Sequence, residues 1–168
     1  PRWIGSRYWQ QASLHTFCDA SKDAISCVIF LRISRDDVIS VHLLAAKARV
    51  APLRRLTIPR LELLAATIGS RIYSDIRNNL EGDIESHFWS DSTTVLAWIR
   101  RKEQWGTYVW NRVEEIRRLT ITDAWRHVPG VFNPSDLPSR GCSPKHLLES
   151  RWWEGPQWLY EEPDCWPR

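Results

Sequence analysis

Apolar residues in the first third of the chain follow the short period of β-strands. The run from Leu14 to Asp19 is predicted to be a strand, and so are the β-branched and apolar segments 24–32 and 38–47. Short polar turns at 20–23 and 33–37 separate them. Three strands with short polar connections predict an antiparallel meander.

A helical period replaces this pattern at about residue 57. Apolar residues recur at 61, 64, 65, 68 and 72, and Pro59 suits the first turn of a helix, where its missing N–H is not needed. Later segments predict a strand at 86–90, helices at 92–101 and 107–119, a strand at 122–128 and a short helix with Asn133 as N-cap and Pro134 at its first position. This order predicts an α/β fold with a mixed five-stranded sheet, an antiparallel three-strand meander plus two parallel strands, and helices on both faces.

Length and composition favour one domain with tails. The chain has 168 residues, 43% of them hydrophobic, which is enough to bury a core. It has no membrane-spanning apolar run and no signal-peptide pattern, so we expect a soluble protein without a membrane partner. Its four cysteines form neither a CxxC pair nor a zinc-ligand spacing, which favours a reducing compartment. The missing initiator Met indicates a segment of a longer chain.

Four acidic residues stand out by their position in the predicted elements. Asp19 ends the first strand in FCDAS, and Asp91 ends the fourth strand in FWSDST. Glu62 lies near the start of the long helix beside small residues, and Asp136 lies in NPSD after the last strand. If the first and fourth strands are adjacent and parallel, Asp19 and Asp91 lie side by side at their carboxyl ends, where sites in α/β sheets are found.

A cluster of these acids would need protons or a cation. Two like charges about 4 Å apart cost on the order of 4 kcal/mol at an effective dielectric of about 20. Oxygen ligands without clustered His or Cys suit Mg²⁺ or Mn²⁺, and two such ions can clamp a phosphodiester. Each acid also has a structural explanation, which is the more common one taken singly: Asp19 as a turn residue, Asp91 as a helix cap, Asp136 as a first-turn acid, and Glu62 as a partner of Arg60. Their joint placement favours a site.

The stretches that hold these acids resemble the ribonuclease H-like domain of BEL/Pao-type retrotransposon polyproteins. The similarity spans residues 14–141 and is carried by LHTFCDAS, AKARVAPLRRLTIPRLELLAA, FWSDSTTVLAWI and RHVPGVFNPSDLPSRG, and LLESRWWEGPQWL is similar to the segment that follows this domain. The resemblance implies a ribonuclease H-like fold. It also implies a catalytic set of Asp19, Glu62, Asp91 and Asp136 holding two Mg²⁺ (or Mn²⁺) ions.

The resemblance further implies hydrolysis of the RNA strand of RNA–DNA hybrids during reverse transcription. It places a reverse transcriptase upstream and an integrase downstream in one polyprotein, in the cytoplasm within virus-like particles. Residues 1–13 are then a lead-in from the polymerase, 14–141 the ribonuclease H-like domain, and 142–168 a Trp- and Pro-rich tail towards the integrase.

The sequence departs from the family pattern near its last acid. Related enzymes often carry a His-bearing loop before the final Asp, but here only Val131 and Phe132 separate HVPG from NPSD. We do not assign His127 the missing role. Pro138 shortens any final helix, so Asp136 is the least secure of the four ligands.

Positive charge lies where a hybrid would need it. The net charge is +3, with +6 over residues 1–148 and −3 over 149–168. Phosphate contacts supply most nucleic-acid affinity. The basic candidates flank the Glu62 helix and end the next one: Lys47, Arg49, Arg54, Arg55, Arg60, Arg100, Arg101 and Lys102. The C-terminal cluster of Trp152, Trp153 and Trp158 sits among acids, so we expect it to pack against this domain or the next.

Three other functions are alternatives for this sequence. A retroviral-type integrase has a Glu about 35 residues after its second Asp, but that spacing falls on His127 here. An aspartic peptidase needs an Asp-Ser/Thr-Gly loop, which neither Asp91-Ser92-Thr93 nor Asp19-Ala20-Ser21 supplies. A catalytically inactive structural or connection module with the same fold stays open, although all four acids are present.

Overall fold

Five strands form one mixed sheet, as predicted. The computed structural model describes residues 11–53 and 56–167 of the chain. The strand order is β3-β2-β1-β4-β5, with bounds β1 (Ala12–Ala20), β2 (Ala24–Arg35), β3 (Val38–Val50), β4 (Glu85–Ser90) and β5 (Trp125–His127). β1, β2 and β3 pair antiparallel, whereas β4 is parallel to β1 and β5 is parallel to β4. This topology is that of the ribonuclease H-like α/β fold, which confirms the predicted fold class.

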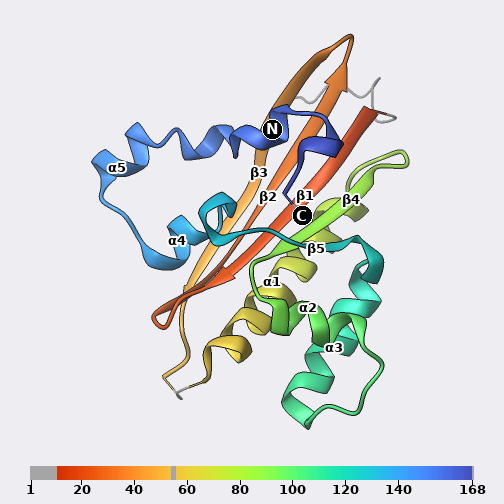
Figure 1. Cartoon of the computed structure of the whole chain (residues 1–168), viewed down its shortest axis with the longest axis vertical. Helices are drawn as coiled ribbons and strands as arrows, with labels where there is room; N and C mark the ends of the chain where they lie inside the picture. Colours follow the sequence, from red (N-terminus) through yellow and green to blue (C-terminus); the bar gives the residue numbers. More distant parts are fainter. Residues whose placement is uncertain (1–10, 54–55, 168) are drawn as a thin grey trace.

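Helices lie on both faces of the sheet (Figure 1). One face is covered by α1 (Ile58–Asn78), α2 (Thr93–Arg100) and α3 (Thr107–Leu119), and the other carries α4 (Asp136–Arg140), with α5 (Pro144–Glu149) further along the chain. Pro59 lies in the first turn of α1, as its missing N–H predicts. Within the described residues, no helix has both the length and the apolar character needed to cross a bilayer.

The β2–β3 hairpin differs from the prediction. A polar turn was expected over 33–37, but β2 continues to Arg35, which pairs with Val38. Only Asp36 and Asp37 make the turn, with φ of 48° and 62°. Two consecutive left-handed residues match the twist of a hairpin, and Asp tolerates this conformation better than most residues. The polar residues therefore predicted the position of the turn correctly. Backbone pairing between β2 and β3 makes the turn shorter than the polar stretch.

The core on the helical side is closed by a close approach of α1 to the sheet. Leu14 and Cys18 of β1 point towards the helices, and both are buried. A Cβ atom at Gly69 of α1 would lie 2.5 Å from the Sγ atom of Cys18, so a larger residue would push the helix outwards. The small residues that follow Glu62 therefore bring its helix close to the sheet, as the sequence predicted.

The opposite face of the sheet is covered by the C-terminal segment. Three 3₁₀ helices follow α5: η4 (Trp152–Glu154), η5 (Gln157–Tyr160) and η6 (Pro163–Cys165). The second core joins strand residues to this segment and contains Phe17, Val28, Phe30, Val41, Trp89, Val128, Trp158, Leu159 and Trp166. The predicted packing of the tryptophan cluster against the domain is confirmed for Trp158, whereas Trp153 is 40% exposed.

A buried arginine ties the same segment to β2. Arg32 donates from Nε to the carbonyl oxygen of Leu159 at 2.9 Å and from Nη2 to that of Glu161 at 3.1 Å. Its guanidinium also lies 5.4 Å from the centre of the Trp166 ring. These contacts supply the hydrogen-bond partners that a buried cation requires.

Candidate active site

Asp19 and Asp91 meet at the carboxyl ends of two parallel strands. Cys18 of β1 is in register with Ser90 of β4, so the next residue of each chain segment is an aspartate. Asp19 is 5% exposed and Asp91 is half-buried. Their carboxyl groups lie close enough for the charge of Asp19 to raise the pKa of Asp91. The predicted adjacency of the two strands, and with it the pairing of these acids, is confirmed.

Ser92 caps the helix that follows Asp91. The hydroxyl oxygen of Ser92 accepts the N–H of Val95 at 3.2 Å, at the start of α2. Asp91 is therefore not the helix cap, which removes the main structural explanation for a carboxylate at this position. In addition, the Oδ1 atom of Asp91 is buried and has no hydrogen-bond partner among the described residues.

Glu62 reaches the same place from α1. It lies in the second turn of that helix, half-buried, and accepts a hydrogen bond from the Ser92 hydroxyl. Ser92 thus connects the α1 carboxylate to the α2 N-terminus beside Asp91. Ser92 was not among the predicted site residues, although its position directly after a strand-terminal Asp was an available signal.

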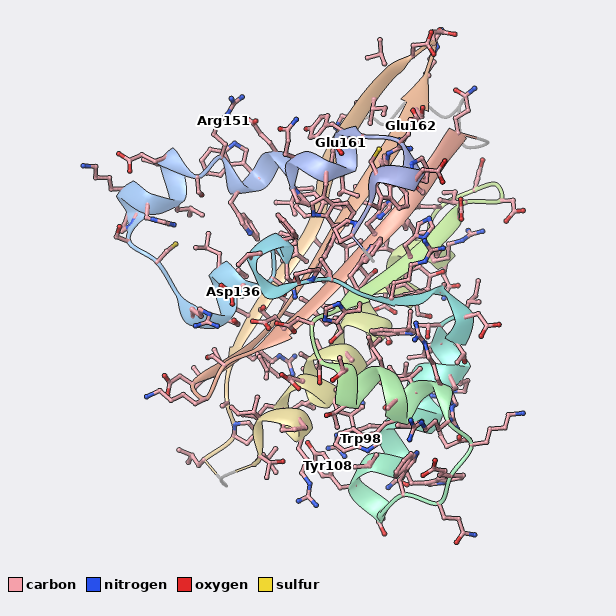
Figure 2. All side chains as sticks on the ribbon, viewed as in Figure 1. Trp98, Tyr108, Asp136, Arg151, Glu161 and Glu162 are labelled. Atoms are coloured by element: carbon pink, nitrogen blue, oxygen red, sulfur yellow. The ribbon has the colours of Figure 1, made fainter. Side chains whose placement is uncertain are left out.

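Asp136 completes the group from α4 on the other face of the sheet (Figure 2). Its Oδ1 atom accepts a hydrogen bond from Nε of Arg140 at 2.5 Å, one turn further along the helix. The charge of Asp136 acts on Asp19, and the charges of Asp19 and Glu62 act on Asp91. The structure therefore brings all four predicted acids into one neighbourhood.

Buried polar side chains fix α4 beside Asp19. Asn133 donates from Nδ2 to the carbonyl oxygen of Cys18 at 3.1 Å, and Ser26, the cross-strand partner of Asp19, contacts the Ser135 hydroxyl at 2.6 Å. The Ser139 hydroxyl donates to Oδ2 of Asp19. We call Asn133, Ser135 and Ser139 the polar latch. All three contacts converge on Asp19 and its immediate neighbours.

The latch corrects one prediction. Asn133 was expected to cap the last helix, with Pro134 at its first position, but α4 begins at Asp136 and is preceded by Ser135. The Nδ2 atom of Asn133 donates to the carbonyl oxygen of Cys18, and the Oδ1 atom of Asn133 accepts the N–H of Ser135 at 3.0 Å. The helix therefore starts later than the sequence signal. Ser135 and Ser139 lie four residues apart, so they share one face of a helix. This spacing could have indicated that both serines face the sheet, but the prediction did not use it.

Removing the latch hydroxyl at Ser139 should destabilise the protein. Ser139→Ala leaves the buried Asp19 carboxylate without this donor, so we expect a loss of about 1–3 kcal/mol in the free energy of unfolding. Urea denaturation followed by circular dichroism measures it. Ser150→Ala is the matched control, because Ser150 is exposed and bonds only a backbone oxygen of its own helix. Equal stability changes in the two variants would contradict the role given to Ser139.

Burial and mutual repulsion make the acids hold protons. Burial, and then the charges of Asp19 and Glu62, raise the pKa of Asp91 to about 7. Burial also raises the pKa of Asp19, against the lowering effect of the Ser139 hydrogen bond, and the nearby Asp136 charge raises it further. Burial likewise raises the pKa of Glu62. Without a cation, Asp91 therefore keeps its proton to a higher pH than an ordinary carboxyl group does.

The raised pKa of Asp91 predicts a stability that depends on pH. The folded state keeps this proton up to a pH of about 7, whereas the unfolded chain loses it near 3.9, so the stabilisation is complete below about 4 and is lost as the pH rises towards 7. Asp91→Asn removes the titrating group. In metal-free buffer, the variant should therefore melt at a higher temperature than wild type near pH 7, and this advantage should shrink on acidification. A temperature difference that stays constant with pH would contradict the assignment.

The basic candidates are distributed unevenly around the site. Lys47 and Arg49 are exposed on β3, opposite Cys27 and Ile25, so they flank the cross-strand neighbour of Asp19. Arg60 is exposed in the first turn of α1, near Glu62. Arg54 and Arg55 lie outside the described residues.

The basic residues 100–102 lie at the other end of α2 from Asp91. The helix has eight residues, so about 12 Å separates its two ends. Arg100 donates to the carbonyl oxygen of Trp125 at 2.5 Å, and Arg101 lies 3.9 Å from Glu103. The structure therefore does not bring Arg100, Arg101 and Lys102 to the carboxylates.

The four acids suit a hard cation in the kind of ligand that they offer. All of them offer oxygen ligands, and Asp91 presents a buried oxygen atom that nothing in the protein satisfies. Among the described residues, however, no group of three or more His, Cys, Asp or Glu side chains is arranged to hold a metal ion. Ser139 occupies Asp19 and Arg140 occupies Asp136, which keeps these two side chains apart from a common centre.

Solved structures with a similar chain path include ribonucleases H. The RNase H1 of the halophilic archaeon Halobacterium salinarum NRC-1 is 15% identical, with a TM-score of 0.47 over 74% of this chain and 89% of that one. LC11-RNase H1, solved in complex with an RNA/DNA hybrid, is 14% identical, with a TM-score of 0.48 over 73% of this chain and 88% of that one. No curated protein matches the chain.

A family model gives the more specific result. The model described as the Pao retrotransposon-like RNaseH-like domain matches residues 1–92, which is more than half of the 168 residues. The matched region includes Asp19, Glu62 and Asp91. The chain therefore belongs to the family of Pao retrotransposon-like RNaseH-like domains.

Proposed function

We propose that this domain is a metal-dependent endonuclease that hydrolyses the RNA strand of RNA–DNA hybrids during reverse transcription of a retrotransposon. The observation that carries the proposal is Asp91. This carboxyl group ends a core strand, plays no capping role, has a pKa raised to about 7 and leaves one oxygen atom without a partner. A structural residue would not be expected to combine these properties.

The residues that would hold two Mg²⁺ (or Mn²⁺) ions are Asp19, Glu62, Asp91 and Asp136. The ions would neutralise the carboxylates, supply an activated water and stabilise the leaving oxygen. To serve as a cation ligand, Asp91 would have to lose the proton that its raised pKa favours, and Asp136 would have to leave its ion pair with Arg140. The guanidinium of Arg140, whose side chain is 72% exposed, would then be available to contact a phosphate.

The rest of the site positions the substrate and the ligands. The polar latch holds α4, and with it Asp136, against β1. Lys47, Arg49 and Arg60 offer positive charge on the approaches to the acids, and Arg54 and Arg55 extend the same basic run in sequence. Within a Pao-type polyprotein, the reverse transcriptase upstream would deliver the hybrid, and an integrase would follow downstream. Virus-like particles in the cytoplasm are the setting in which that sequence of reactions would run.

The decisive experiment is cleavage of a labelled RNA–DNA hybrid by the folded protein in Mg²⁺ or Mn²⁺, beside RNA-duplex and DNA-duplex controls. We expect cleavage of the RNA strand of the hybrid, with neither control cut and no reaction in EDTA. The engagement of Asp19 by Ser139 and of Asp136 by Arg140 favours a second candidate, a catalytically inactive structural module. A folded protein that cuts no hybrid in either metal, alone or fused to its polymerase, would establish that candidate.

A further inference from the structure

Two arginines from different helices share one tyrosine ring beside the start of α1. The guanidinium carbon of Arg112 in α3 lies 3.5 Å from the centre of the Tyr108 ring, and that of Arg60 in α1 lies 5.5 Å from it. The two guanidinium carbons are therefore no more than 9 Å apart. Both distances fall within the range of cation–π contacts. Figure 2 shows Tyr108 among the helices on the α1–α3 side, with Asp136 beyond the sheet from it.

Backbone contacts fix this arrangement. Nη1 of Arg112 donates to the carbonyl oxygen of Tyr108 at 3.0 Å, which holds the guanidinium over the ring one turn back along α3. The Tyr108 hydroxyl donates a long hydrogen bond to the carbonyl oxygen of Arg60 at 3.4 Å. The ring therefore joins α3 to the first turn of α1. Arg60 lies two residues before Glu62, about 3 Å of helix rise away, and side chains two residues apart leave a helix on different sides.

Neither positive charge has an ion pair of its own among the described residues, although the charge of Arg112 acts on Glu115 and lowers the pKa of that carboxyl group. The nearby acids of α3 are already engaged, since Glu115 binds Arg71 at 2.6 and 2.9 Å and Glu114 binds Arg117 at 2.9 Å. In the part of the chain that the structure describes, neither Arg60 nor Arg112 lies within ion-pair distance of a carboxylate, and Nε of Arg112 is buried without a hydrogen-bond partner. Two guanidiniums held near each other without a counter-ion repel, so an anion between them would be stabilised.

We propose that Arg60, Tyr108 and Arg112 form a clamp for a backbone phosphate of the bound nucleic acid. The inference rests on the proposed function, because it names how the same site would hold its substrate. A phosphate between the two guanidiniums can accept charge-assisted hydrogen bonds of about 2.8 Å from both. The tyrosine ring holds each guanidinium through a cation–π contact and so limits how far the two can separate. The clamp reads no base, so it positions the strand rather than selecting a sequence.

Binding of a fluorescein-labelled RNA–DNA hybrid in EDTA tests the clamp without strand cleavage. Fluorescence anisotropy at several salt concentrations gives the affinity and its salt dependence. Arg60→Gln and Arg112→Gln should each weaken binding about fivefold and reduce the slope of log K against log salt by about 1. Tyr108→Leu should weaken binding similarly, because the charges remain but lose their support, whereas Tyr108→Phe keeps the ring and should bind like wild type.

Arg118→Gln is the matched control, because it removes one positive charge from an exposed position of the same helix. It should change the affinity by about twofold at most. An equal loss in Arg118→Gln and Arg112→Gln would overturn the clamp in favour of diffuse attraction. A Tyr108→Leu variant that has a lower melting temperature but binds the hybrid like wild type would also overturn the clamp, since the ring would then contribute only to packing. Thermal melting of every variant accompanies the titration.

The clamp and the nuclease can fail separately. Hybrid that binds through Arg60 and Arg112 but is never cut in Mg²⁺ would remove the nuclease and support the clamp. Conversely, cleavage by the Arg60→Gln, Arg112→Gln double variant with an unchanged KM would remove the clamp while supporting the nuclease.

Discussion

Replacing Asp91 with asparagine should abolish cleavage of an RNA–DNA hybrid in Mg²⁺ while leaving the protein folded. Asparagine keeps the shape of the side chain but cannot supply the anionic oxygen that a cation requires. The loss of a residue that only supports a metal ligand costs about 10–100-fold in affinity or activity, so the loss of a central ligand should exceed about a hundredfold. Cleavage rates at saturating Mg²⁺, with circular dichroism to confirm folding, measure the effect.

The matched control for this substitution is Asp123→Asn. Asp123 is exposed in the turn before β5 and lies away from the four acids, so its substitution removes the same charge without touching the site. We expect cleavage within about twofold of wild type, as for most surface substitutions. Hybrid cleavage by Asp91→Asn at the wild-type rate would exclude Asp91 from catalysis and, with it, the two-metal assignment.

Replacing Trp158 with alanine should cause the largest loss of stability. Trp158 is 7% exposed and lies 4.9 Å from the Trp89 ring and 5.7 Å from the Phe17 ring, centre to centre. Its Nε1 atom also donates to the carbonyl oxygen of Phe132 at 3.2 Å. Truncating a buried tryptophan leaves a cavity and costs about 3–5 kcal/mol. For a protein of this size, that corresponds to a fall in melting temperature of about 6–20 °C.

Trp153 supplies the control for this prediction. It lies five residues earlier in the same segment but is 40% exposed, so Trp153→Ala should cost about 1 kcal/mol or less. Urea denaturation followed by tryptophan fluorescence and circular dichroism distinguishes the two. If both substitutions cost the same, the C-terminal segment does not form a core with the sheet.

The regular elements could be predicted because their side chains repeat with the period of the backbone. The apolar runs that predicted β1 and β2 reflect strands buried on two faces, and the spacing of Leu61, Leu64 and Ile68 reflects the one face of α1 that meets the sheet. Pairing of Asp19 with Asp91 followed from this, because two parallel strands must end at the same edge. These inferences need only local pattern and strand direction.

The remaining features depend on contacts between residues far apart in the sequence. Ser26 holds Ser135 across 109 positions, so the start of α4 could not be read from NPSD alone, and the local signal at Asn133 gave the wrong cap. The tryptophans after Gly141 have no period because Trp152, Trp153 and Trp158 lie in short 3₁₀ turns rather than in a long helix or a strand. The clamp at Tyr108 joins two helices whose relative placement no periodicity encodes.

The closure of the second face by the C-terminal segment also sets the order in which this protein can fold. Asp19 receives its hydrogen bond from a residue 120 positions later, and Arg32 is satisfied by a residue 127 positions later. Such distant pairs make folding slow and leave the sheet face bare during synthesis. A ribosome that has made β1, β4 and even β5 has therefore not yet made the second core, which needs Trp158, Leu159 and Trp166. The complete fold would form late in translation, once the chain has emerged through Trp166.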